Sequence, residues 1–100
     1  ETGAILTAAR YGFCTNNLIM ICPCACCNEC AKCIIDSGIK QIVTHKKYHD
    51  FAISGTIWEE KLKIAFEMLD QAKVDVIMYD KDVFDDQSFS IRVGGERFYP

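Results

Sequence analysis

The chain has 100 residues, half of which are apolar, so it is long enough for one small domain with a hydrophobic core. It carries 11 basic and 14 acidic residues, a net charge of −3 with no basic block, which argues against a nucleic-acid partner. The longest apolar run is shorter than a membrane span and no signal peptide pattern is visible, so we expect a cytoplasmic protein with no membrane contact.

The first half of the chain predicts alternating helices and strands. Apolar residues at helical spacing predict helices over 2–11 and 30–37, with Gly12 and Gly38 as their stops. A short apolar run predicts a buried strand over 18–22, and a β-branched run predicts a second strand over 39–44.

The second half continues this alternation. Thr56 and Glu59 have capping-box spacing and predict the start of a helix. Apolar residues follow at i, i+3, i+4 and i+7: Leu62, Ala65, Phe66 and Leu69. A strand is predicted over 74–79, and a terminal hairpin over 88–99 turns at Gly94-Gly95. This order of elements predicts an α/β layered fold with parallel neighbouring strands.

Cysteine is concentrated in one short stretch. Six of the seven cysteines lie there: Cys22, Cys24, Cys26, Cys27, Cys30 and Cys33. A disulfide framework would spread its cysteines along the chain, so this density indicates metal or redox chemistry. Three Cys-x-x-Cys pairs overlap in the stretch, and spacing alone does not choose among them. The predicted helix start favours Cys27 and Cys30, because a helix N-terminus stabilises anionic thiolate ligands.

The residues around this pair resemble a known family. The stretch Cys27-Asn-Glu-Cys-Ala-Lys-Cys-Ile-Ile-Asp-Ser-Gly-Ile-Lys40 is similar to the second zinc motif of the deoxycytidylate (dCMP) deaminases. That motif typically reads Pro-Cys-x-x-Cys-Ala-Lys, then an aliphatic pair, then Gly-Ile-Lys. The patch Lys47-Tyr-His-Asp50 resembles the loop after the family's next strand. The similarity extends over roughly residues 1–80 and is tight over 27–50; Cys26 departs from it, because the family usually has Pro there.

The resemblance implies a fold and a set of site residues. The fold is a three-layer αβα, cytidine-deaminase-like mixed sheet, with 1–100 as a single domain whose N-terminal strands would precede this sequence. Cys27 and Cys30 would be zinc ligands, and Glu1 would align with the catalytic Glu of the family's His-x-Glu motif. The third zinc ligand, a histidine, would lie two residues before Glu1. Tyr48 would contact the substrate. Without that histidine, we expect the chain as given to be inactive or nearly so.

The implied reaction is the zinc-dependent hydrolytic deamination of dCMP to dUMP by a homo-oligomeric cytoplasmic enzyme. Zinc would activate a water for attack on C4 of the pyrimidine, and Glu1 would carry the protons. Four alternatives stay open: a deaminase for another nucleobase, a deaminase fold without catalysis, a redox or iron–sulfur site, and a structural Cys₂His₂ zinc module. The last would use four residues: Cys27, Cys30, His45 and His49. The roles of the other four cysteines in the cluster stay open too.

Overall fold

The computed structural model describes residues 1–24, 26–53, 55–82, 90–93 and 95–99. Its helices are α1 (Thr2–Arg10), α2 (Asn28–Asp36), α3 (Lys46–Ile53) and α4 (Trp58–Gln71). Its strands are β1 (Ile19–Cys22), β2 (Gln41–His45), β3 (Asp75–Tyr79), β4 (Ile91–Val93) and β5 (Glu96–Phe98). Every helix and strand predicted from the sequence is therefore present, apart from small shifts at the ends. The expected burial of the first strand was wrong, because no described helix covers the outer face of β1 and Ile21 there is 81% exposed.

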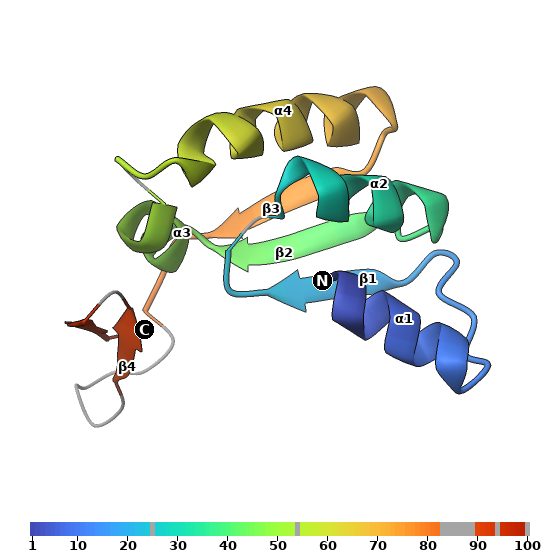
Figure 1. Ribbon diagram of the computed structural model, residues 1–100, viewed down its shortest axis with the longest axis horizontal. Helices are drawn as coiled ribbons and strands as arrows, with labels where there is room; N and C mark the ends of the chain where they lie inside the picture. Colours follow the sequence, from blue (N-terminus) through green and yellow to red (C-terminus); the bar gives the residue numbers. More distant parts are fainter. Residues whose placement is uncertain (25, 54, 83–89, 94, 100) are drawn as a thin grey trace.

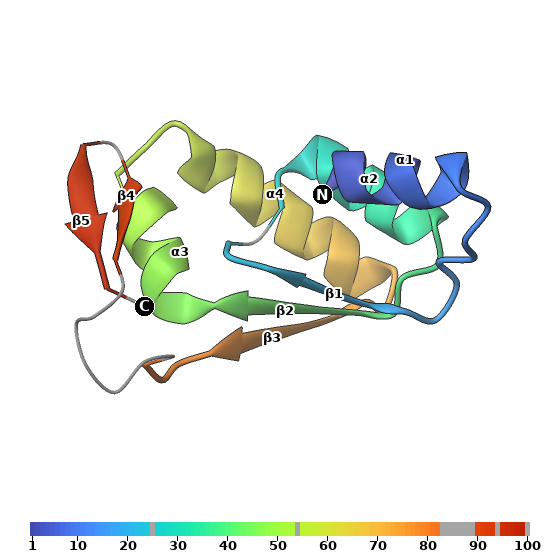
Figure 2. The same ribbon diagram turned by 90° about the horizontal axis from the view of Figure 1, so that it is seen from below.

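The central feature is a parallel sheet with strand order β1-β2-β3. Helices α1, α2 and α4 lie on one side of this sheet, as the edge-on view shows (Figure 2). The predicted α/β fold with parallel neighbours is confirmed. Among the described residues no helix layer covers the other face of the sheet, so the described part has two layers. The antiparallel strands β4 and β5 form a separate hairpin rather than joining a mixed sheet (Figure 1).

The hydrophobic core lies between the sheet and helices α2 and α4. Ile42 of the central strand is completely buried against both helices' apolar faces. The other members of this core cluster come from the Cys26–Ile39 region and from α4 and its end: Cys26, Ala31, Ile34, Ile39, Ala65, Leu69 and Val74. Because α2 and α4 each bury a stripe at helical spacing, this one core fixes both helices on the sheet. No helix in the described ranges is long and apolar enough to cross a membrane.

The sequence did not predict helix α3. Lys46–Ile53 has no buried side chain, so it lacks the apolar stripe that identifies a helix in a sequence. It is stabilised locally instead. The Nδ1 atom of His45 accepts a hydrogen bond from the backbone N–H of Tyr48 at 3.1 Å, which caps the helix, and Lys46 pairs with Asp50 one turn on at 2.8 Å. The expected loop at 47–50 was therefore wrong.

The start of α4 and the terminal hairpin differ in detail from expectation. Helix α4 begins at Trp58, one residue later than the predicted capping box requires. The Thr56 hydroxyl accepts from the N–H of Trp58, and the Glu59 carboxylate accepts from the N–H of Gly55, both at 3.3 Å. The predicted hairpin is confirmed over Ile91–Val93 and Glu96–Phe98; its expected first residues, 88–89, and Gly94 lie outside the described residues.

Candidate functional site

The chain after β1 is held at the carboxyl edge of the sheet. The carbonyl of Pro23 accepts hydrogen bonds from the Thr44 hydroxyl at 3.1 Å and from the backbone N–H of His45 at 3.2 Å. Both donors belong to the end of β2, and Thr44 is buried. This anchor makes the chain reverse direction, so that α2 begins beside the carboxyl ends of the strands. In parallel α/β sheets, ligands commonly bind at that edge.

Cys27 and Cys30 lie together on the first turn of α2. Cys27 is the N-cap residue, and its carbonyl accepts the first helical hydrogen bond from Ala31 at 2.9 Å. The backbone N–H of Cys30 lowers the pKa of the Cys27 thiol; burial opposes this, and the Cys30 thiol and the N–H of Glu29 add to the lowering. Burial raises the pKa of Cys30, opposed by its contact with Thr2. The predicted pair therefore shares one helix start, and the pKa of Cys27 is shifted toward the thiolate that a metal requires.

Glu1 and Thr2, at the start of α1, reach the same helix start. The Thr2 hydroxyl donates to the Cys30 sulfur at 3.3 Å, a contact between residues 28 apart in the sequence. In Figure 2 the N-terminus lies beside the first turn of α2. The charge of Glu1 contributes to raising the pKa of Cys30, after burial and the Cys27 thiol. Two helix N-termini thus converge, one bearing Glu1 and the other bearing the cysteine pair.

A cavity of about 360 Å³ lies at this convergence. Its walls come from α1, the cysteine loop, α3 and the start of α4: Glu1, Cys24, Cys27, Ala52, Ile53, Trp58 and Leu62. The volume is in the range of small-molecule sites. Sequence reasoning placed Glu1 and Cys27 in the site but missed the wall formed by Ala52 and Ile53, because it missed α3. Trp58, at the start of α4, is a further wall residue that the sequence did not point to.

Two other cysteines of the cluster are core thiols. Burial, with a smaller contribution from Glu1, raises the pKa of Cys22 to about 11 and that of Cys26 to about 12. Cys26 is almost completely buried in the main core, and Cys22 packs against it. Neutral thiols of this kind behave as small hydrophobic residues. Cys24 differs from both, because it lines the cavity beside Cys27; burial raises its pKa as well.

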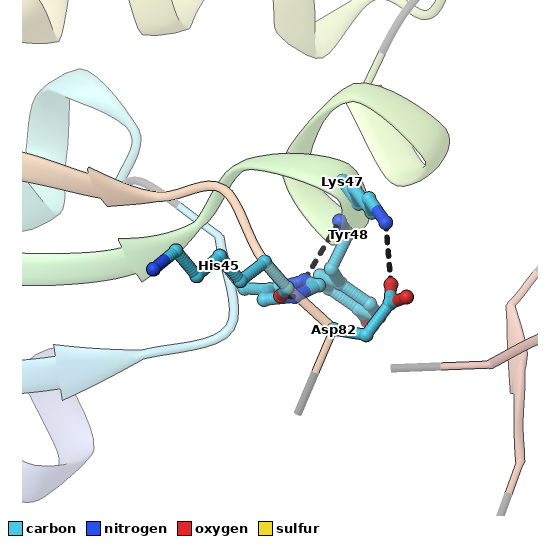
Figure 3. Close-up of polar contacts among 5 residues, drawn as sticks. His45, Lys47, Tyr48 and Asp82 are labelled. Carbon is cyan, nitrogen blue, oxygen red and sulfur yellow. Dashed lines mark hydrogen bonds and ion pairs between the residues drawn. The ribbon is translucent and has the colours of Figure 1, made fainter. Parts of the chain in front are cut away.

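Tyr48 lies in a separate cluster at the end of β2. Its ring packs edge-on against Phe98 of β5, with ring centroids 5.3 Å apart, while its backbone N–H caps onto His45. Figure 3 shows the contact of Tyr48 with His45 and, beside it, the ion pair of Lys47 with Asp82. The residues that α3 contributes to the 360 Å³ cavity are later ones in the helix, Ala52 and Ile53. The structure therefore brings Glu1, Cys27 and Cys30 together, whereas Tyr48 packs against Phe98 and is not one of the described residues that line this cavity.

The two histidines occupy positions apart from the cysteine pair. Both ring nitrogens of His45 have partners, because Nδ1 accepts from Tyr48 and Nε2 lies 2.9 Å from the carbonyl oxygen of Lys81. A neutral ring with its hydrogen on Nε2 satisfies both contacts. The ring of His49 lies 6.0 Å from that of Phe66 on α4. Within the described part of the chain, no three His, Cys, Asp or Glu side chains are arranged to hold a metal ion, so a Cys₂His₂ set is not assembled.

Comparison with protein-family models and with curated proteins identified no relative of the chain. No protein-family model matches the chain, and no curated protein matches it at a significant level.

Proposed function

We propose that this chain carries the site of a zinc-dependent nucleobase deaminase, with dCMP as its substrate. The observation that supports this most is the convergence of Glu1 with Cys27 and Cys30 beside one cavity. Glu1 lies at the start of α1 and the cysteine pair at the start of α2. The hydrogen bond from Thr2 to the Cys30 sulfur joins these two helix starts. A carboxylate that is not a ligand, next to a thiolate pair on a helix start, is the arrangement that zinc deaminases use.

The chain provides donors that suit two of the ligand positions of one zinc ion. Two thiolates one helical turn apart suit a borderline-soft metal, and the start of α2 favours their charge. A catalytic zinc takes three protein ligands, so one donor beyond Cys27 and Cys30 is required. The family resemblance supplies it as a histidine two residues before Glu1. Zinc, when bound, provides the Lewis acid that activates the attacking water.

The residues of this chain then have separate roles. Cys27 and Cys30 hold the metal on the first turn of α2. Glu1 would take one proton from the attacking water and pass it to the ring nitrogen next to C4. It would then take the second proton from the same oxygen, now bound to C4, and deliver it to the amine, which leaves as ammonia as the C4=O bond forms. The side chains of Ala52, Ile53 and Leu62 give the cavity an apolar wall, which suits a flat pyrimidine ring.

The proposal is tested by a gain of function. Two forms of the chain are prepared, one with His-Ala placed immediately before Glu1 and a matched control with Ala-Ala. Both are loaded with zinc and supplied with dCMP, and released ammonia and dUMP are measured. We expect the His-Ala form to turn over dCMP and the Ala-Ala form to do so at least about 100-fold more slowly. Equal rates in the two forms, or no turnover in either, would count against the proposal.

A further inference from the structure

Helix α3 forms part of the cavity wall, yet it has eight residues and no buried side chain of its own. A helix this short is marginal in water when it is isolated. Its contacts with the rest of the chain therefore decide whether Ala52 and Ile53 stay at the cavity. One contact is to α4, where the ring of Phe66 lies 6.0 Å from that of His49. Another is to the terminal hairpin, which lies beside α3 in Figure 2.

Phe98 of β5 contacts α3 with its ring. The centroid of this ring lies 5.3 Å from that of Tyr48 and 5.2 Å from that of Phe51, and these two residues stand three apart on one face of the helix. It also lies 5.9 Å from the ring of His45, whose Nδ1 atom caps α3. Ring contacts at such distances are favourable. Phe98 therefore contacts both the cap of α3 and the turn that follows it.

The hairpin depends on the same contact. Strands β4 and β5 have three residues each and form a two-stranded sheet. A two-stranded hairpin is at best marginally stable in water by itself. Within β5, Glu96 and Arg97 are exposed, whereas Phe98 is only 8% exposed. The short helix and the short hairpin therefore stabilise each other through the ring of Phe98, and loss of this ring should loosen both.

We propose that Phe98 is a positioning residue of the candidate site, because it holds α3, and with it the wall of Ala52 and Ile53, at the cavity. The two wall residues follow Phe51 directly in the helix, so loss of the ring contact releases them too. The cysteine pair belongs to the start of α2 and should stay in place. The consequence for substrate rests on the proposed function: a loosened wall binds the pyrimidine ring more weakly and leaves zinc binding unchanged.

The chain contains a probe for the position of this wall. Trp58 is its one tryptophan, and it lines the same cavity as Ala52 and Ile53. On the zinc-free chain, we expect Phe98→Ala to increase the quenching of Trp58 fluorescence by acrylamide at least about 1.5-fold, because the wall no longer shields the indole ring. Hydrogen exchange of the α3 amides should become at least about tenfold faster, while α2 and α4 keep their protection.

Tyr99→Ala is the matched control, since Tyr99 follows Phe98 directly and is 41% exposed. It should leave the quenching within about 1.2-fold and the α3 exchange within about twofold. Phe98→Leu keeps apolar bulk without the ring and should speed α3 exchange by about threefold, so it decides the question if Phe98→Ala does not fold. Unchanged quenching and unchanged α3 exchange in a folded Phe98 variant would overturn the proposal.

The effect on substrate is measured in the His-Ala-extended form loaded with zinc. We expect Phe98→Ala to raise KM for dCMP at least about fivefold, with kcat and zinc affinity each within about twofold, because the wall contacts substrate and transition state alike. A folded Phe98→Ala with an unchanged KM, or with its zinc affinity lost, would overturn the role of Phe98 at the site. If no form turns over dCMP, the proposed function fails, and quenching and exchange still decide whether Phe98 holds the wall.

Discussion

Glu1→Gln is expected to lower the rate of dCMP deamination by about 10²- to 10⁴-fold in the active, His-Ala-extended form. Glutamine keeps the shape of the side chain but cannot accept the proton of the attacking water. Glu1 lies on the wall of the cavity that Cys27 also lines, so a proton carried there is close to the site of attack. Initial rates of ammonia release at saturating dCMP measure the effect.

The same variant separates a catalytic role from a structural one. Glu1 is not a zinc ligand in the proposed site, so the zinc affinity of Glu1→Gln should equal that of the unmodified form within about threefold. Glu1→Asp retains a carboxylate and should recover part of the rate. If Glu1→Gln is as active as the parent form, Glu1 is not the group that carries the proton. If it loses zinc and activity together, Glu1 acts on the metal site instead.

Cys30→Ser is expected to weaken zinc binding by about 100-fold or more, because the site loses one of its few protein donors. Cys30 holds its position through the first turn of α2 and the hydrogen bond from Thr2 at 3.3 Å. The matched control is Cys33→Ser, three residues further along the same helix. It should leave zinc affinity within about threefold, because Cys33 is outside the proposed ligand pair. Competition against a chromophoric chelator measures both affinities.

The outcome distinguishes the overlapping cysteine pairs. If Cys33→Ser weakens zinc binding as much as Cys30→Ser does, the metal is held further along α2 than proposed. If neither substitution has an effect while Cys24→Ser does, the ligands come from the loop after β1. Circular dichroism on each zinc-free variant controls for loss of the helix itself.

The predicted elements and the real ones agree where burial and periodicity coincide. Helix α4 buries Leu62, Ala65 and Leu69 at helical spacing, and the sequence shows that spacing directly. Strand β2 belongs to the predicted β-branched run, and its Ile42 and Thr44 are buried. Gly38 ends α2 as predicted, with a φ of +79°, and a side chain at this position would collide with Asn16. In each of these cases the residue type is the one that its packing or backbone conformation requires, so the sequence alone is enough to predict the element.

Helix α3 could not be predicted in the same way. It has no apolar stripe, and its cap is a histidine rather than one of the usual Ser, Thr, Asp or Asn residues. The ring of His45 is set in place by contacts that are distant in the sequence, namely Lys81 and Phe98. A local reading of the polar residues 46–50 therefore favoured a loop. Missing α3 also hid the cavity wall that Ala52 and Ile53 provide.

For the site, the sequence could predict the cysteine pair but not its surroundings. Cys27 and Cys30 were chosen over the neighbouring pairs because a helix was expected to start there, and α2 does start at Asn28. The approach of Glu1 to this helix depends on how α1 packs on α2, which no local pattern contains. The sequence also could not predict that the described helices cover only one face of the β1-β2-β3 sheet. A continuous apolar run such as β1 predicts a strand that is buried on both faces, whereas β1 alternates between exposed and half-buried residues.

X-ray absorption on the zinc-loaded 100-residue chain tests the central claim most directly, because it reports the atoms bound to the metal. The proposed site predicts one zinc per chain with two sulfur atoms at about 2.3 Å and lighter nitrogen or oxygen atoms at about 2.0–2.1 Å in the remaining positions. Cys30→Ser should reduce the sulfur shell from two atoms to one, and Cys33→Ser should leave it at two. A shell of four sulfur atoms, or one without sulfur, would contradict the account.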